Sequence, residues 1–132
     1  MDAYGHVNNV QFLRLFEDAR VTTFKDWFGP ANTLLDEGIL VTRHEIEYLA
    51  PLSFRHEPVR VDVWVSDVVG AGFTLAYEMR DPDPLGQTRY AVATTGLVAY
   101  DFATARPRRL PAPVRSVLAE YADEPPGWRW RR

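Results

Sequence analysis

The first residues of the chain have the types and spacing that could do chemistry. Asp2 lies in a polar turn with Gly5 and His6, and Asn8 and Asn9 follow directly. Asn is a favoured helix N-cap residue, so this turn is predicted to lead into a helix. The first backbone N–H groups of a helix lack partners within it and carry partial positive charge. A carboxylate beside them could attack an acyl carbonyl, or activate water to do so, while the N–H groups hold the oxyanion.

A long helix must position these groups. It is predicted from Val10 to about Phe28, because that stretch holds no proline or glycine, and Gly29 ends it. Its apolar residues cover more than one face, which predicts a mostly buried helix. Glu17 lies within it, and a buried acid needs a partner. Arg14 or Arg20 could supply that partner, and this ion pair is favoured over a catalytic role for Glu17.

Four long strands are predicted after the helix, because apolar and polar residues alternate with the period of two that strands show. They cover 39–49, 59–66, 73–80 and 88–102. Two residues of the first, Thr42 and His44, could face the site. A short helix is predicted over 113–121, and residues 125–132 are predicted to be loosely ordered. The order predicts an α+β fold in one domain, 1–132, with an antiparallel sheet around one helix.

Composition narrows the function classes. The 132 residues carry a net charge of −3, which argues against a general nucleic-acid binder. There is no cysteine, which excludes disulfides, cysteine nucleophiles and thiolate metal sites. The three histidines, His6, His44 and His56, lack close metal-ligand spacing, so no metal site is expected. Neither a membrane span nor a signal peptide is recognisable, and a cytoplasmic protein is expected.

The residues together resemble a known family. The segment Asp2-Ala3-Tyr4-Gly5-His6-Val7-Asn8-Asn9, followed by Glu17-Asp18-Ala19-Arg20, resembles the hotdog-fold acyl-CoA thioesterases of the 4-hydroxybenzoyl-CoA thioesterase type. The resemblance extends over nearly the whole chain. It implies a hotdog fold, with the sheet wrapped around the long helix, and a homodimer or homotetramer with active sites at the dimer interface.

The resemblance also implies residue roles. Asp2 matches the catalytic carboxylate, and Asn9 matches the residue whose backbone N–H polarises the thioester carbonyl. Gly5, His6, Asn8, Val10 and Glu17 are possible supporting residues, and His6 is favoured as an orienting group over an acid or base. The implied substrate is an acyl-CoA or acyl-carrier-protein thioester. No cofactor is expected apart from the coenzyme A of the substrate.

The chain departs from the family pattern in two places. The first family strand, which precedes the Asp, is apparently missing. The turn after Val65 lacks the basic residues that contact coenzyme A phosphates in some members, so other arginines would be needed. The candidates are Arg55, Arg60, Arg106, Arg108 and Arg109, and none is favoured singly. Phe12 and Phe16 are expected to line part of the acyl pocket.

Other functions are kept open. The first alternative is a non-catalytic hotdog module that binds acyl-CoA or a protein partner without turnover, and the apparently missing strand favours it slightly. Hydration of an enoyl thioester is a further alternative, but the Asp/His motif expected for that branch is not found in the sequence.

Overall fold

The predicted helix and strands are present in the computed structural model, which describes residues 9–29, 38–52, 58–82 and 86–130. In chain order the elements are α1 (Asn9–Phe28), β1 (Ile39–Tyr48), β2 (Arg60–Val69), β3 (Gly72–Arg80), β4 (Arg89–Asp101), β5 (Arg106–Pro107) and α3 (Ala112–Glu120). None of the helices within these ranges is both long and apolar enough to cross a membrane.

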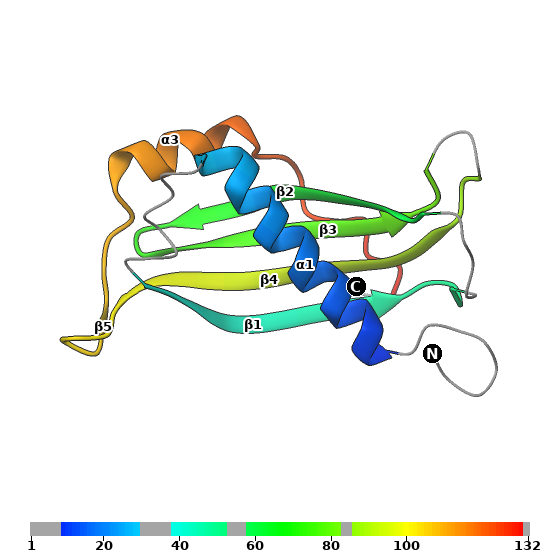
Figure 1. Cartoon of the computed structure of the whole chain (residues 1–132), viewed down its shortest axis with the longest axis horizontal. Helices are drawn as coiled ribbons and strands as arrows, with labels where there is room; N and C mark the ends of the chain where they lie inside the picture. The colour runs from blue at the N-terminus through cyan, green and yellow to red at the C-terminus, as the bar shows by residue number, and fades with distance from the viewer. Residues whose placement is uncertain (1–8, 30–37, 53–57, 83–85, 131–132) are drawn as a thin grey trace.

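The strands form one antiparallel sheet in the order β1-β4-β3-β2, and β5 pairs with β4. Figure 1 shows α1 lying across one face of this sheet, here called the inner face. The register shifts between Val41 and Arg43 in β1, and between Val65 and Asp67 in β2. Such bulges bend a strand and re-aim its side chains. The helix that lies across this antiparallel sheet confirms the predicted α+β architecture.

The core lies between α1 and the inner face. Phe12, Phe16 and Phe24 lie four or eight residues apart on α1, and each is at most 3% exposed. This spacing places them on one side of a helix. The Phe16 ring lies 5.1 Å from that of Tyr77, and the Phe24 ring lies 6.1 Å from that of Phe73. The aromatic face of α1 therefore anchors it to β3.

Two expectations for α1 are wrong. Val10 is 71% exposed, and Leu13 and Val21 are each 42% exposed, so only one face of the helix is buried. In the described part of the chain the sheet covers α1 from one side, which leaves its opposite face open. Phe12 and Phe16 are packed in the core, and their side chains are not available to line an open acyl pocket.

The C-terminal segment is also more ordered than expected. Residues 121–130, here called the strap, cross the sheet on its outer face, behind the strands in Figure 1. At β2, the Val65 N–H donates to the Tyr121 carbonyl at 2.9 Å, and the Asp123 N–H donates to the Val65 carbonyl at 2.8 Å. The strap thereby covers part of the outer edge of β2.

Side chains of the sheet hold the strap by its backbone. Trp64 Nε1 donates to the Glu124 carbonyl at 2.6 Å. Near β1, the Arg129 N–H donates to Glu47 Oε1 at 2.7 Å. The prediction of a loosely ordered tail is therefore wrong, because its backbone groups find partners on strands far away in sequence.

Hydrogen bonds to a buried carboxylate connect β3 and β4 at the end of their hairpin. Asp81 is 5% exposed, and its carboxylate accepts hydrogen bonds from the Tyr90 hydroxyl at 2.6 Å and from the Thr88 N–H at 3.2 Å.

We expect Tyr90→Phe to lower the free energy of unfolding by about 1–3 kcal/mol, because it removes a donor from a buried carboxylate. Urea denaturation measures this loss. Tyr121→Phe, at a residue that is 39% exposed, is the control and should change stability by under about 0.5 kcal/mol.

Candidate active site

The start of α1 is where the predicted chemistry would take place. The helix begins at Asn9 and has no acidic residue in its first turn. The first backbone N–H groups of any helix lack partners within the helix and carry partial positive charge. In α1 no carboxylate of the first turn offsets that charge. The other residues of the opening motif (Asp2, Gly5, His6 and Asn8) lie outside the described ranges. The predicted start of the helix is confirmed.

A hollow of about 440 Å³ lies on the open side of α1. Val10, Leu13, Arg14, Glu17 and Asp18 line it. Two of the sequence candidates, Val10 and Glu17, therefore share one surface next to the helix start. The hollow is open to solvent, since all five of these residues are exposed, and it combines apolar side chains with both signs of charge.

Glu17 does not make the ion pair expected from the sequence. Its side chain is exposed, and within the described ranges no Lys or Arg nitrogen is found within 4.0 Å of its carboxylate. Arg20 instead donates from Nη1 to the hydroxyl of buried Tyr77 at 3.2 Å. Because water solvates the Glu17 carboxylate, the physical reason for a partner disappears.

His44 adds a titratable group to this region. It lies on β1, and its Nδ1 is 3.0 Å from the Thr95 hydroxyl of β4. Burial lowers the pKa of His44 below the ordinary value of 6.5; the positive charge of Arg20 lowers it further, and the negative charge of Glu17 opposes both. The strand period places His44 on the inner face with Ile46, but only the fold brings it near α1.

The charges of Arg20 and Glu17 provide a test of how these two residues lie relative to His44. We expect the His44 ring to titrate below 6.5, Arg20→Gln to raise its pKa, and Glu17→Gln to lower it, because each variant removes one charge that acts on the imidazole. An NMR pH titration of the ring measures all three midpoints. Midpoints that move in the opposite directions would contradict the arrangement.

The same shift predicts a pH dependence of stability. Because the pKa of His44 is lower in the folded chain, the unfolded chain binds more protons just below pH 6.5. The contribution of His44 to stability is therefore complete above pH 6.5 and decreases as the pH falls toward the folded-state pKa. Urea titrations of the parent and of His44→Gln at several pH values should show this difference.

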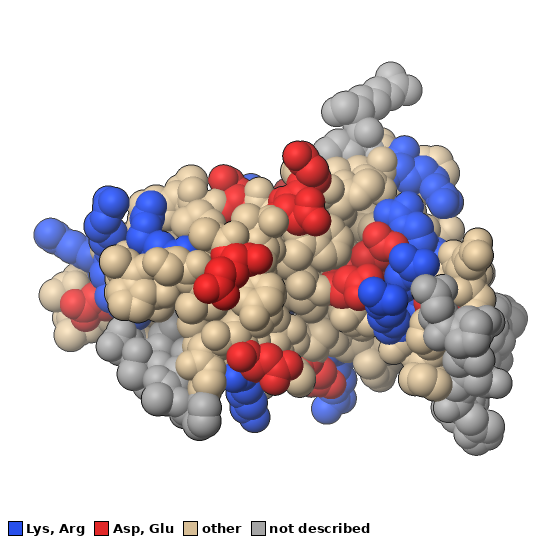
Figure 2. Space-filling model, turned by 90° about the horizontal axis from the view of Figure 1, so that it is seen from above, with Lys and Arg blue, Asp and Glu red and all other residues tan. Residues whose placement is uncertain are grey.

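The arginine candidates for phosphate contact do not converge on one site. Arg60 pairs with Asp62 at 2.7 Å, and Arg108 donates to the Gly38 carbonyl at 3.2 Å. Arg106 and Arg109 are exposed, whereas Arg55 lies outside the described ranges. Figure 2 shows basic side chains gathered mainly toward the two ends of one view, with acidic side chains between them. That view shows no continuous basic surface.

Metal ligands do not cluster in the described part of the chain. Within it, no group of three or more His, Asp or Glu side chains could hold a metal ion.

Comparison with known proteins adds an independent line of evidence. A family model described as the thioesterase-like superfamily matches residues 1–120. That range includes the opening motif and every helix and strand of the structure. No curated protein sequence matches the chain.

Solved structures share the fold, and 83 of their chains match. A predicted thioesterase from Bacillus stearothermophilus has a TM-score of 0.80 and 24% identity, covering 95% of this chain and 90% of its own. A 1,4-dihydroxy-2-naphthoyl-CoA thioesterase from Synechocystis has a TM-score of 0.78 and 18% identity, covering 91% and 88%. A Thermus thermophilus thioesterase, complexed with coenzyme A and Zn, has a TM-score of 0.72 and 27% identity, covering 92% and 85%.

Proposed function

The chain belongs to the thioesterase-like superfamily, and on this basis we propose that it hydrolyses an acyl-CoA thioester to a free acid and a thiol. The observation that carries the proposal is the family match over residues 1–120, which contains both the Asp2 motif and the helix that follows it. The hollow beside the start of α1 supports it, since it offers apolar and charged side chains next to the backbone N–H groups of the first helical turn.

The proposed chemistry uses Asp2 as nucleophile or general base. As a nucleophile, its carboxylate oxygen forms a bond to the thioester carbon, the C–S bond breaks, and water then hydrolyses the acyl–Asp anhydride. As a base, Asp2 takes a proton from the water that attacks the carbonyl. In both routes the backbone N–H of Asn9, with that of Val10 beside it, stabilises the oxyanion.

No further cofactor is part of the proposal. The thiolate is a good leaving group, so the reaction needs neither a strong general acid nor a redox group. Coenzyme A enters as part of the substrate, and an acyl-carrier protein is the other possible carrier. Glu17, with Gly5, His6 and Asn8, supports the site without touching the reacting carbon. We further propose a homodimer or homotetramer with the active sites between subunits.

The test is thiol release from acyl-CoAs with short, medium, long and aromatic acyl groups, followed with a thiol-reactive chromophore. We expect turnover of at least one class, and the preferred class identifies the acyl group. Thioesters of an acyl-carrier protein form a second arm. Binding of coenzyme A without turnover in either arm would contradict hydrolysis and favour a binding module.

A further inference from the structure

The inner face of the sheet is not covered equally along its width. One row of the register runs from His44 of β1 through Thr95 of β4 to Leu75 of β3. Thr95 and Leu75 are at most 1% exposed, whereas His44 is exposed. Val41 pairs with Leu97, two residues from Thr95, so it lies on the same face, and it is 39% exposed. In the described part of the chain, the inner face is therefore open along β1, beside the helix that crosses the sheet obliquely in Figure 1.

Polar side chains of α1 and of three strands lie beside this open part. Arg20 Nη1 donates to the Tyr77 hydroxyl at 3.2 Å, and His44 Nδ1 lies 3.0 Å from the Thr95 hydroxyl. Arg20 is close enough to His44 for its charge to lower the pKa of the imidazole. We call Arg20, His44, Thr95 and Tyr77 the donor cluster, because each side chain carries an N–H or O–H group.

The donor cluster has donors that the described residues do not use. A guanidinium carries several N–H groups in a planar fork, and the half-buried Arg20 uses one of them on a neutral hydroxyl. Within the described ranges, no carboxylate oxygen is found within 4.0 Å of its nitrogens. When Thr95 donates to Nδ1 of His44, the proton of the neutral ring is on Nε2. A ligand can therefore accept hydrogen bonds from both Arg20 and His44.

The balance of charge favours a negatively charged ligand. Among the charges that act on the His44 ring, the positive charge of Arg20 has a larger effect than the negative charge of Glu17. Glu17 is exposed, so water screens its charge. An anionic oxygen near Arg20 and His44 would accept charge-assisted hydrogen bonds, which are roughly twice as strong as those between neutral groups.

We propose that the donor cluster binds a carboxylate carried by the acyl group, so that the preferred substrates are thioesters of dicarboxylic acids. This specificity rests on the proposed hydrolysis, whereas binding of the carboxylate does not. The guanidinium of Arg20 holds the carboxylate from α1, and Nε2 of His44 donates to it from β1. The exposed side chain of Val41 offers apolar surface to the methylene groups of the acyl chain. A few placed polar groups on an apolar surface are typical of a small-molecule site.

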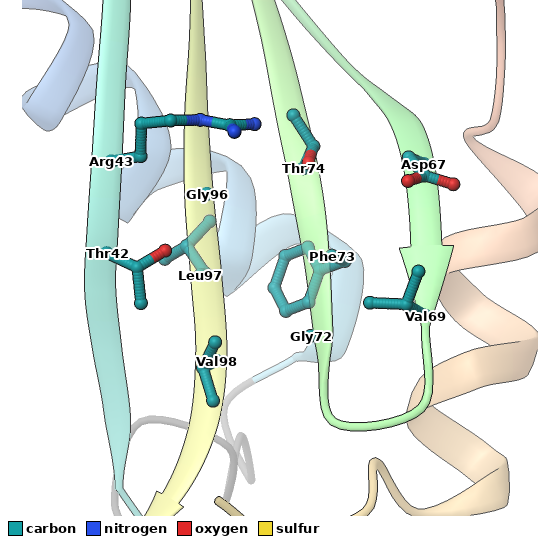
Figure 3. Close-up of a pocket in the computed structure, with 10 residues that line it drawn as sticks. All are labelled: Thr42, Arg43, Asp67, Val69, Gly72, Phe73, Thr74, Gly96, Leu97 and Val98. Carbon is teal, nitrogen blue, oxygen red and sulfur yellow. The ribbon is translucent and has the colours of Figure 1, made fainter.

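The hollow on the outer face lacks such a set of donors. It measures about 330 Å³, and Figure 3 shows side chains of all four long strands around it. Arg43 pairs with Gly96, Gly96 with Thr74, and Thr74 with Asp67, so the two charged residues of this row stand at its opposite ends. Arg43 Nε also lies 3.4 Å from Glu45 Oε1. A carboxylate bound there would compete with Glu45 for a single basic side chain.

Binding of adipamate tests the carboxylate site without turnover. Adipamate has a carboxylate at one end and an uncharged amide at the other, whereas adipamide has an amide at both ends. We expect the parent to bind adipamate about ten- to a hundred-fold more tightly than adipamide, because hydrogen bonds between charged groups are stronger than neutral ones. Isothermal titration calorimetry measures both dissociation constants.

Single variants identify the groups that bind the carboxylate. Arg20→Gln should weaken adipamate binding about ten-fold or more, and Arg20→Lys should retain part of the affinity because it keeps the charge but not the planar fork. His44→Gln should weaken binding by a smaller factor. Glu17→Gln should strengthen binding, because it removes a like charge. Arg43→Gln is the matched control, since it removes the same charge from the residue next to His44, on the outer face, and should leave binding unchanged.

Thermal melts show that each variant is folded. His44 and Glu17 are exposed, so their variants test the site even if Arg20→Gln is unstable. Equal binding of adipamate and adipamide by the parent would overturn the proposal. Parental adipamate binding by both the His44 and the Glu17 variants would also overturn it.

Thiol release from adipoyl-CoA and hexanoyl-CoA tests the specificity. The two acyl chains have the same length, and only the adipoyl chain carries a carboxylate. We expect kcat/KM of the parent to be about ten-fold or more higher for adipoyl-CoA, mainly through KM, because the donor cluster does not touch the reacting carbon. Arg20→Gln should bring the two values close together.

The two measurements separate the site from the reaction. Selective binding of adipamate without hydrolysis of either thioester would support the carboxylate site and contradict the proposed hydrolysis. Hydrolysis of hexanoyl-CoA as fast as adipoyl-CoA would support hydrolysis and overturn the proposed preference for dicarboxylic acyl groups.

Discussion

Asp2→Asn is expected to lower kcat by about 10²–10⁴-fold, the range that a positioned general acid or base contributes. Asn is almost the same size as Asp but is a poor nucleophile and cannot accept a proton at neutral pH. The donors at the start of α1 remain, so a residual rate from oxyanion stabilisation should persist. Thiol release at saturating concentrations of the preferred acyl-CoA measures kcat, and its concentration dependence measures KM.

The matched control for this prediction is Asp26→Asn. Asp26 is exposed near the far end of α1, so the same chemical change there should leave kcat unchanged. Retained binding of coenzyme A by the Asp2 variant would separate a loss of chemistry from a loss of binding. A kcat equal to that of the parent would overturn the role proposed for Asp2.

Phe24→Ala is expected to lower the free energy of unfolding by about 3–5 kcal/mol, as deletion of a buried aromatic side chain does. Phe24 is 1% exposed, and its ring lies 5.9 Å from that of Phe28 and 6.1 Å from that of Phe73. The truncation leaves a cavity between α1 and β3 that rigid strands cannot fill. A loss of this size is a large part of the stability of a small domain.

Urea or guanidinium denaturation followed by circular dichroism measures this change. Lys25→Ala is the control, because the neighbouring side chain is exposed and its removal should change stability by under about 0.5 kcal/mol. If Phe24→Ala were as mild as this control, α1 could not be held to the sheet in the way the structure describes. Activity would be compared well below the melting temperature, where the variant is still folded.

Several features could be predicted from the sequence because they depend on local chemistry. The Asn residues mark the start of α1, the absence of proline and glycine allows its length, and Gly29 ends it with a positive φ of 74° that glycine adopts without strain. The alternation of apolar and polar residues identifies the four long strands and assigns each side chain to a face. The opening motif indicated the family that the chain belongs to.

Other features depend on which strands become neighbours, and local chemistry does not encode that. Only the fold sets Arg20 against Tyr77 and His44 against Thr95, which are 57 and 51 residues apart. The buried face of α1 likewise depends on where the sheet lies, so the sequence pattern alone overestimated its burial.

The opening motif, the elements and their periodicity were thus determined by the sequence itself, because neighbouring residues encode caps, turns and alternation. The tertiary structure alone decided that the strap lies on the outer face, where it meets Trp64 and Glu47. It also decided that Arg43 and Asp67 end one row of the sheet. The physical reason is that strand order and register are set by packing over the whole chain, and a shift of one residue would move every side chain to the opposite face.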